Sequence, residues 1–297
     1  MGADTSAGGL TQVLWGGLTV GCLYAVLLLG VLIVFQVSKS INFAYGQVGM
    51  VAALGGWYLA SAAGLPIWSA LIIGAAAAVL VNSAIDFVAI RRIPEGRPGL
   101  DLVVTLGLFL LLTAVMQQLV DANSHTFASL GSDTSTVVGG VVVSVNDVFV
   151  IALTLVLVTV AHLLLTRTSL GTSLRASAED ATIASAAGVN VLRLRTGVWA
   201  VAGLLAAVVG YLVASRLSVD AFYMTPILVK VFIAGMIGGL DRFLAPLLVA
   251  VLLGVYEAGA AFLLGASAGT PAVFLLIIVA LAVMPRRFMN ERSEVRA

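Results

Sequence analysis

Charged residues are scarce in this sequence. Only 10% of its 297 residues are charged, whereas about 25% is usual for a soluble domain. Hydrophobic residues make up 61% of the chain, and the mean hydropathy is +1.14. Such a composition leaves too little polar surface for a fold in water, so it predicts a polytopic membrane protein. The formal net charge of +1 argues against nucleic-acid binding, which needs a basic face.

Residue types that bind metals or carry out covalent catalysis are also few. Cys22 is the only cysteine, which excludes an internal disulfide and a thiolate metal cluster. His125 and His162 are the only histidines and lie far apart in the sequence. Neither Lys39 nor Lys230, the only lysines, lies in the G-x-x-x-x-G-K-[ST] loop that binds nucleotide phosphates. We therefore expect no enzyme activity, metal or cofactor on this chain, and any ATP must be hydrolysed by partner subunits.

Long apolar runs dominate what is present. A helix needs about 20 apolar residues to cross the hydrocarbon core. The runs predict an all-α transmembrane bundle of 8–10 spans that forms a single domain over residues 1–297. They cover residues 10–36, 42–63, 67–90, 102–120, 148–166, 196–215, 226–240, 243–264 and 271–285. The seventh run would rise only about 22 Å as a helix, so we expect a broken or re-entrant element there.

Positive charge gives the orientation, because Lys and Arg concentrate in cytoplasmic loops. With the N-terminus outside and nine spans, 13 of the 15 Lys and Arg residues fall in cytosolic segments. They are Lys39, Arg91, Arg92, Arg97, Arg167, Arg175, Arg193, Arg195, Arg242, Arg286, Arg287, Arg292 and Arg296. The C-terminus is then cytosolic. The loop from Asp121 to Asp147, which has no Lys or Arg, faces outward.

The longest polar interruption on the cytosolic side runs from Arg167 to Arg195. Residues 173–187 are mostly Ala and Ser with a few charges, a composition that favours a helix. Gly188 can end that helix in a left-handed conformation, and Asn190 can cap a second helix that begins at Val191. A thin helix held between two spans fits a groove in another protein, which indicates a handle gripped from the cytoplasm. The alternative is a solvated connector.

Polar residues inside apolar spans tend to line interiors or pathways. The segment INFAYGQ, residues 41–47, places Asn42, Tyr45 and Gln47 at the cytosolic start of the second span. They either cap the helix and fix a turn or contribute to a translocation path.

Two charged residues also fall inside spans. Counted from the outer helix ends, Lys230 lies about 6 Å deep and Glu257 about 12 Å deep. They form an ion pair if their helices are neighbours, or Lys230 snorkels and Glu257 stands apart. Three further polar residues, Asp86, Gln117 and Gln118, lie close to span ends, where we expect them at the membrane interface.

Three motifs together resemble the LivH-type permease family, the membrane subunits of ABC importers for branched-chain amino acids. They are INFAYGQ, R-A-S-A-E-D-A-x-x-A-S-A-A-G-V-N, and K-V-F-I-A-G-M-I-G-G-L followed by G-V-Y-E. The resemblance implies a type II importer fold in the cytoplasmic (inner) membrane. It also implies a second permease subunit (sister or identical), two cytosolic ATPase subunits and an extracytoplasmic solute-binding protein. The residues it assigns to the coupling helix that docks in the ATPase are Ala178, Glu179, Asp180, Ala184 and Gly188.

The expected function is therefore a permease that forms the path for branched-chain or related small hydrophobic amino acids. The family's commoner second-span motif is INFAHGE, so Tyr45 and Gln47 replace a titratable His and a carboxylate. That departure leaves open a permease for another small solute, such as urea, a short amide or a sugar. A stand-alone secondary transporter or channel is the third possibility, with Lys230, Glu257 and Asp86 as its only candidates for a coupling-ion site.

Overall fold

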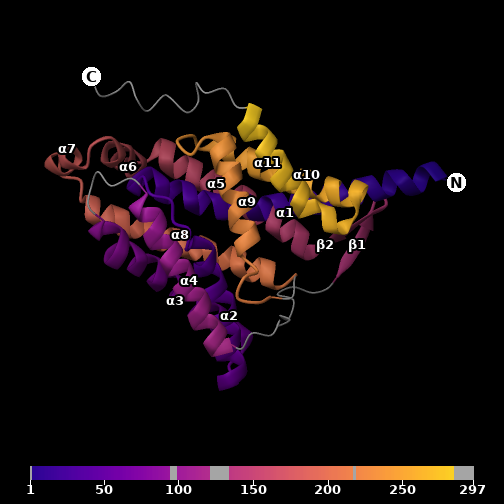
Figure 1. Ribbon diagram of the computed structural model, residues 1–297, viewed down its shortest axis with the longest axis horizontal. Helices are drawn as coiled ribbons and strands as arrows, with labels where there is room; N and C mark the ends of the chain where they lie inside the picture. The colour runs from indigo at the N-terminus through magenta and orange to yellow at the C-terminus, as the bar shows by residue number, and fades with distance from the viewer. Residues whose placement is uncertain (1, 94–98, 121–133, 217–218, 284–297) are drawn as a thin grey trace.

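The computed structural model describes residues 2–93, 99–120, 134–216 and 219–283. Within these ranges the chain forms a helical bundle with one short β-hairpin (Figure 1). The α-helices are α1 (Gly2–Ser38), α2 (Tyr45–Ala63), α3 (Ile67–Ala84), α4 (Leu100–Val120), α5 (Val145–Arg167), α6 (Ser169–Glu179), α7 (Ala181–Ala186), α8 (Val191–Ala214), α9 (Thr225–Gly238), α10 (Leu244–Leu264) and α11 (Gly269–Val283). A π-helical turn, η1 (Ile85–Ala89), and two 3-10 turns, η2 (Ile90–Arg92) and η3 (Ala266–Ala268), complete the helical elements. The strands are β1 (Ser135–Val138) and β2 (Val141–Ser144).

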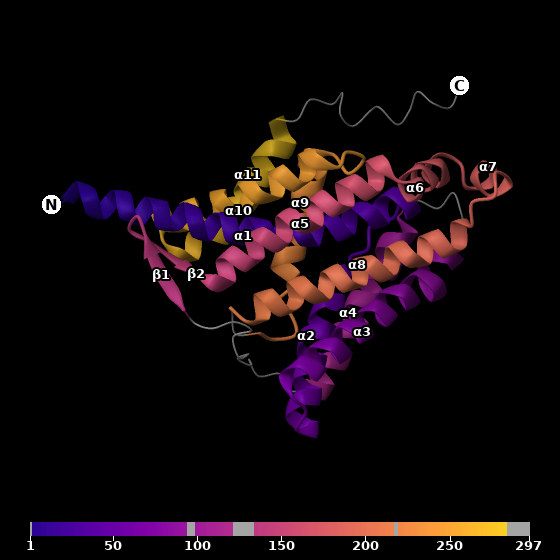
Figure 2. The same ribbon diagram turned by 180° about the vertical axis from the view of Figure 1, so that it is seen from behind.

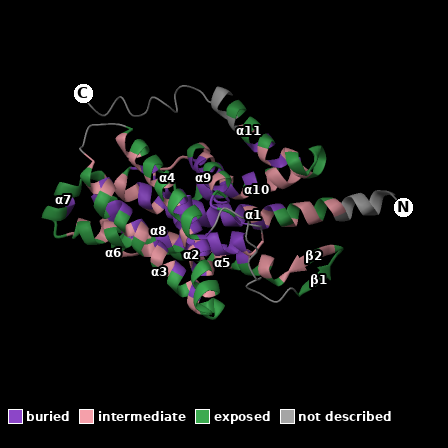
Figure 3. Ribbon diagram, turned by 60° about the horizontal axis from the view of Figure 1, so that its bottom comes forward, coloured by how far each residue is buried: buried purple, intermediate pink, exposed green. Residues whose placement is uncertain are grey.

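Helices α1 and α8 form the centre of the bundle. In the most apolar stretch of each, 83% of the α1 residues and 67% of the α8 residues are buried. In the other helices of membrane-spanning length that share is at most 28%. A helix that is apolar all round is suited to such an interior position. The outer helices expose large apolar side chains instead, which suits contact with lipid (Figure 3).

Each of the nine predicted apolar runs contains a helix. Among the described residues, six helices are long and apolar enough to cross a membrane by length and composition. These are Gly9–Ser38, Ile67–Arg92, Leu100–Val120, Val145–Arg167, Val191–Ala214 and Leu244–Leu264. The other three runs correspond to α2, α9 and α11. The chain is therefore a polytopic helical bundle, as the composition predicts.

The seventh run is short, as predicted, because α9 starts inside the bundle. It has 14 residues, and its N-cap, Met224, is fully buried. Glycines on α2 make room for this start: a Cβ on Gly49 would lie 3.2 Å from the Met224 side chain and 2.6 Å from the carbonyl oxygen of Ala206. The chain thus folds back into the bundle before α9 begins, and whether this element is broken or re-entrant in the membrane stays a prediction.

The predicted cytosolic interruptions meet at one end of the molecule. Lys39, which follows α1, forms an ion pair with Asp241, which precedes α10. A cavity lined by both of these residues is also lined by Arg175 of α6. Figure 2 shows α6 and α7 at this end, with the start of α1 and the β-hairpin at the opposite end. Arg97, His125 and the arginines after residue 283 lie outside the described residues.

The β-hairpin was missed by the sequence analysis, which predicted only helices. β1 and β2 are antiparallel, and Gly139 and Gly140 join them with φ of +60° and +84°. Two glycines between apolar strands are a typical signal for such a turn. The side-chain amide of Gln12 bonds both the N–H (2.7 Å) and the carbonyl (3.2 Å) of Val142, which fixes the hairpin to α1.

Backbone-to-backbone packing joins α1 to α10. A Cβ on Gly21 would lie 2.4 Å from the carbonyl oxygen of Val251, and one on Gly254 would lie 2.3 Å from the amide nitrogen of Gly21. One turn away, a Cβ on Gly17 would lie 2.8 Å from Cα of Val255. Small residues four positions apart allow helices to approach this closely in a membrane.

We expect Gly21→Leu to separate α1 from α10, because no side chain fits at this crossing. The cost should be about 3 kcal/mol or more, the upper range for overpacking. It should appear as a lower midpoint of thermal unfolding in detergent. Gly16→Leu is the matched control on the same helix, since a Cβ there meets nothing within 4 Å. Equal midpoints for the two variants would contradict the packing described.

Candidate functional site

The predicted coupling segment, residues 167–195, contains a helix break that the sequence analysis did not predict. A single helix was expected over residues 173–187, but α6 ends at Glu179 and α7 begins at Ala181. The Asp180 carboxylate accepts the N–H groups of Thr182 (2.7 Å) and Ile183 (2.9 Å). Aspartate bonds in this way as an N-cap and gains less inside a helix, which explains the break.

The predicted end of this helical segment is confirmed. Gly188 has φ of +89°, in the left-handed region that glycine adopts most readily. The N–H of Val189 bonds the carbonyl of Ala184 at 3.0 Å, which closes the last turn of α7. The Asn190 side chain then accepts the N–H of Arg193 at 3.0 Å. It thereby caps α8, the second predicted helix, which is continuous with the sixth span.

The five predicted docking residues are distributed over both helices of this segment. Glu179, Asp180 and Gly188 are exposed, Ala178 is half-buried and Ala184 is buried. Ala178 and Glu179 line a cavity of about 380 Å³ that is also bounded by the ends of α1 and α5. In Figures 1 and 2, α7 forms the tip of the molecule at this end. The segment therefore offers two short helices to a partner.

The N-terminal side of the coupling segment is fixed to α5. Thr168 caps α6 by accepting the N–H of Gly171 at 3.4 Å. A Cβ on Gly171 would lie only 2.0 Å from the carbonyl oxygen of Leu165, so α6 packs directly on the last turn of α5. The Arg175 guanidinium donates to the same Leu165 carbonyl. Movement of α6 must therefore displace the end of α5.

On its C-terminal side, the segment is bound to Asp86. This carboxylate accepts hydrogen bonds from Arg195 (Nε–Oδ1, 2.6 Å) and from Arg91 (Nε–Oδ2, 2.7 Å), and it forms ion pairs with both. Asp86 is fully buried among these partners, near the end of a span as the sequence places it. The sequence did not reveal the ion pair with Arg195, because Arg195 is 109 positions away. The three residues join the end of α3 to the start of α8.

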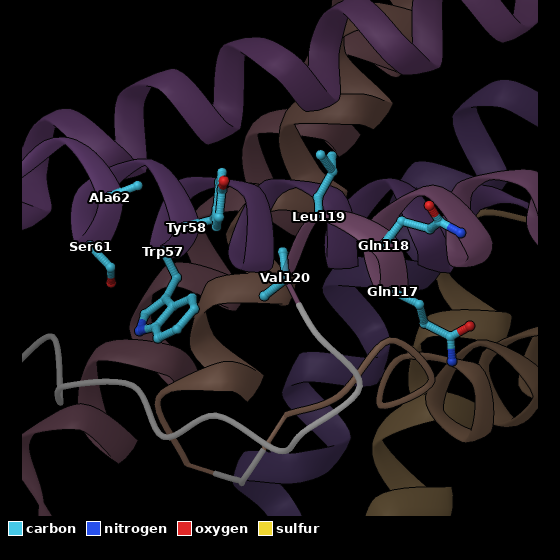
Figure 4. Close-up of a pocket in the computed structure, with 8 residues that line it drawn as sticks. All are labelled: Trp57, Tyr58, Ser61, Ala62, Gln117, Gln118, Leu119 and Val120. Carbon is cyan, nitrogen blue, oxygen red and sulfur yellow. The ribbon is translucent and has the colours of Figure 1, made fainter.

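Gln117 and Gln118 are exposed near the end of α4, and their place at the membrane interface stays a prediction. With Trp57, Tyr58 and Ser61 of α2 they line a hollow of about 600 Å³ (Figure 4). In that view the two glutamine amides lie to one side of the aromatic rings and are not directed at them. The hollow is open and has no charged lining residue among those described.

The polar residues of INFAYGQ contact three other helical elements. Asn42 accepts the N–H of Ala44 at 3.0 Å, which fixes the turn before α2, and its amide donates to Asn82 of α3 at 3.4 Å. The Tyr45 hydroxyl donates to the carbonyl of Ala202 in α8 at 2.8 Å. Gln47 donates to Thr225, at the start of α9, at 3.3 Å. Gln47 is fully buried, and its Oε1 has no partner in the described part of the chain.

Lys230 and Glu257 form an ion pair, one of the two arrangements that the sequence left open. Two residues that the sequence analysis missed complete the cluster. Tyr24 of α1 donates to Glu257 Oε2 at 2.7 Å, and Thr270 of α11 lies 2.9 Å from Glu257 Oε1. Lys230 also donates to Thr270 at 3.1 Å. Tyrosine and threonine in apolar spans gave no signal that could have singled them out.

Comparisons with known proteins agree with this architecture. Residues 13–284 match the family model described as "Branched-chain amino acid transport system / permease component". The permease protein BraD of the high-affinity branched-chain amino acid transport system of Pseudomonas aeruginosa is 28% identical over 96% of both chains. LivH of Escherichia coli K12, named for the same kind of system, is 26% identical over 96% of both chains. A probable branched-chain amino acid transport permease protein LivH of Methanocaldococcus jannaschii is 24% identical, over 93% of this chain and 89% of that protein.

A solved structure supports the fold alone. The structure titled "PsaBC from Streptococcus pneumoniae in complex with Fab" superposes with a TM-score of 0.52 over 92% of both chains, at 10% identity. The family model, by contrast, matches the chain from the first membrane helix to the last. The chain therefore belongs to the family of permease components of branched-chain amino acid transport systems.

Proposed function

We propose that this chain is one permease subunit of an ATP-driven importer and forms, with a second permease subunit, a path for branched-chain or related small hydrophobic amino acids. The observation that carries the proposal is the α6–α7 segment, which projects from one end of the bundle and is fixed to it at both sides. The names of the relatives support the solute class. The second permease subunit is either a sister protein or another copy of this chain.

In the proposed mechanism, two cytosolic ATPase subunits bind and hydrolyse ATP, and this chain carries out no reaction. When the ATPase subunits close, they draw the coupling segments together. The packing of Gly171 on Leu165 passes that movement to α5, and the bonds of Arg195 to Asp86 pass it to α3. Access to the path then switches between the two sides of the membrane. An extracytoplasmic binding protein delivers the solute.

The topology is part of the proposal. The chain lies in the cytoplasmic (inner) membrane with its N-terminus outside, and the end that holds α6 and α7 faces the cytosol. Support comes from the charge distribution, because 13 of 15 Lys and Arg residues fall on that side in this arrangement. The outward end then carries the β-hairpin, within the 121–147 segment that we propose as part of the binding protein's docking surface.

Within the coupling segment, the five proposed docking residues have different tasks. Glu179 is exposed and has no ion pair among the described residues, so it is free to bind a cation of the ATPase. Asp180 and Gly188 set the direction of α7 through the cap and the left-handed turn. Ala178 is small and half-buried, which allows a partner to approach α6 closely, and the buried Ala184 packs inside the segment.

For the translocation path we propose Asn42, Tyr45, Gln47, Lys230 and Glu257. The hydroxyl of Tyr45 donates its proton to a carbonyl of α8, which favours a positioning role. Gln47 differs, because its Oε1 retains a free acceptor position. Among the five residues proposed for the path, Gln47 therefore offers a carbonyl oxygen that can accept a hydrogen bond from a solute ammonium or amide group.

Two alternatives remain with an observation attached to each. A permease for another small solute, such as urea, a short amide or a sugar, is favoured by the neutral pair Tyr45 and Gln47 in place of a His and a carboxylate. A stand-alone secondary transporter is disfavoured, because its only candidate ion sites, Lys230, Glu257 and Asp86, are already ion-paired.

Reconstitution with and without the ATPase subunits tests the proposal, which requires that uptake depend on both the subunits and ATP.

We expect Glu179→Lys and Gly188→Trp each to abolish ATP-dependent uptake while the protein stays in the membrane. The first reverses the exposed charge, and the second places a large side chain on a backbone with φ of +89°. Uptake and membrane abundance are measured in parallel. Gly64→Trp is the matched control, since Gly64 also has positive φ (+60°) and open space around it but lies between α2 and α3. Normal uptake by either test variant would rule out the docking role.

The Lys230–Glu257 cluster generates a separate prediction. Lys230→Met or Glu257→Gln alone leaves a buried charge without its partner, which typically costs about 3–5 kcal/mol. The double variant removes both charges and should recover most of the unfolding midpoint in detergent. If the double variant is stable but transports nothing, the pair acts in the path. If it is as unstable as the single variants, the energetic description of the pair is wrong.

A further inference from the structure

A cleft of about 700 Å³ opens beneath the coupling segment. Its walls come from α5 and α8, its back from Ile33 of α1, and its floor from Leu170 and Leu174 of α6 and the turn at Gly188. The lining is largely apolar. A Cβ on Gly197 of α8, which also lines the cleft, would meet nothing within 4 Å. The cleft is therefore open space between two helices that are each long and apolar enough to span a membrane.

The cleft runs along α8, a helix that is long and apolar enough to span a membrane. It extends along α8 from Arg193 to Val201, eight residues or about 12 Å of helix. The hydrocarbon half of a bilayer is about 15 Å thick. A slot of this length between two helices that are apolar enough to span a membrane suits an acyl chain of the bilayer. Acyl chains are the molecules that occupy such a space in a membrane.

The charge of the lining residues indicates which group a bound acyl chain carries at its polar end. Arg193 is the only charged residue among those that line the cleft in the described part of the chain. It is exposed, and it forms no ion pair with a described residue. Ser173 and Asn190 also line the cleft and add polar groups. An apolar slot with an unpaired arginine at its membrane-boundary end complements an acyl chain that carries an anionic headgroup.

We propose that this cleft binds one anionic phospholipid of the surrounding bilayer, with an acyl chain along α5 and α8 and its phosphate at Arg193. The bound chain packs against Leu170 and Leu174, so the lipid supports the base of the coupling segment. Which leaflet supplies it rests on the proposed topology. The binding itself does not depend on the proposed transport function.

Native mass spectrometry of the complete chain in detergent, with whatever subunits co-purify, tests the proposal. The protein is delipidated and titrated with phosphatidylglycerol or with phosphatidylcholine of the same acyl chains. We expect one site that binds phosphatidylglycerol about fivefold more tightly than phosphatidylcholine, because one basic residue near a membrane surface contributes about that factor in affinity. Arg193→Gln should abolish that preference. Gly197→Leu fills the slot and should lower the affinity for both lipids at least tenfold, since the new side chain displaces two or more methylene groups of the acyl chain.

Two matched controls separate the site from general effects. Arg92→Gln removes an exposed basic residue outside the cleft, and Gly107→Leu adds the same side chain to an open, exposed position on α4. Both should bind lipid as the parent chain does. Equal binding of the two lipids by the parent chain, or unchanged binding by Gly197→Leu, would overturn the proposal. Lipid binding that appears only after a second permease subunit is removed would assign the cleft to that subunit instead.

Discussion

The bonds of Asp86 to Arg91 and Arg195 are the interaction on which the proposed coupling depends. A buried carboxylate pays a large desolvation cost, and two arginines offset it with charge-assisted hydrogen bonds of 2.7 and 2.6 Å. Because Arg195 lies at the end of the coupling segment, the same bonds that satisfy Asp86 hold that segment to α3. Gly171 and Arg175 hold its other end to α5. A force on α6 and α7 therefore acts on two membrane helices at once, and a flexible connector would not have this property.

Most of the described interior polar groups have hydrogen-bond or ion-pair partners within the chain, as the hydrocarbon of a bilayer requires. The Lys230–Glu257 pair has Tyr24 and Thr270 around it, so each Glu257 oxygen has a partner. Helix packing then relies on close contact, because lipid gives no hydrophobic drive between helices. The glycines of α1 and α10 supply that contact. Polar clusters and glycine crossings thus take the roles that apolar burial has in a soluble protein.

The sequence predicted the helices because membrane-spanning length is a property of a continuous run, and no contact between distant residues is needed to find it. Gly188 and Asn190 were predictable for the same reason, since caps are local. The break at Asp180 was also local, but the helix-forming composition around it masked the cap. The environment of Asp86 was not predictable, because its partner Arg195 comes from another helix. Tyr24 and Thr270 were not predictable either, since their polarity matters only where α1 and α11 meet the ion pair.

Four buried side-chain atoms have no partner among the described residues: Gln47 Oε1, His162 Nδ1, Trp199 Nε1 and Arg216 Nε. Two of them, Gln47 Oε1 in α2 and Trp199 Nε1 in α8, lie on neighbouring helices. Each such group costs about 1–3 kcal/mol, and the cost falls on two helices that pack against each other. Helix α8 is capped by Asn190, so it begins where the coupling segment ends. A rearrangement that let these atoms bond water or solute would recover that free energy. A pull on the coupling segment reaches α8 directly, and α8 packs against α2, so both unpaired atoms lie on helices connected to that segment.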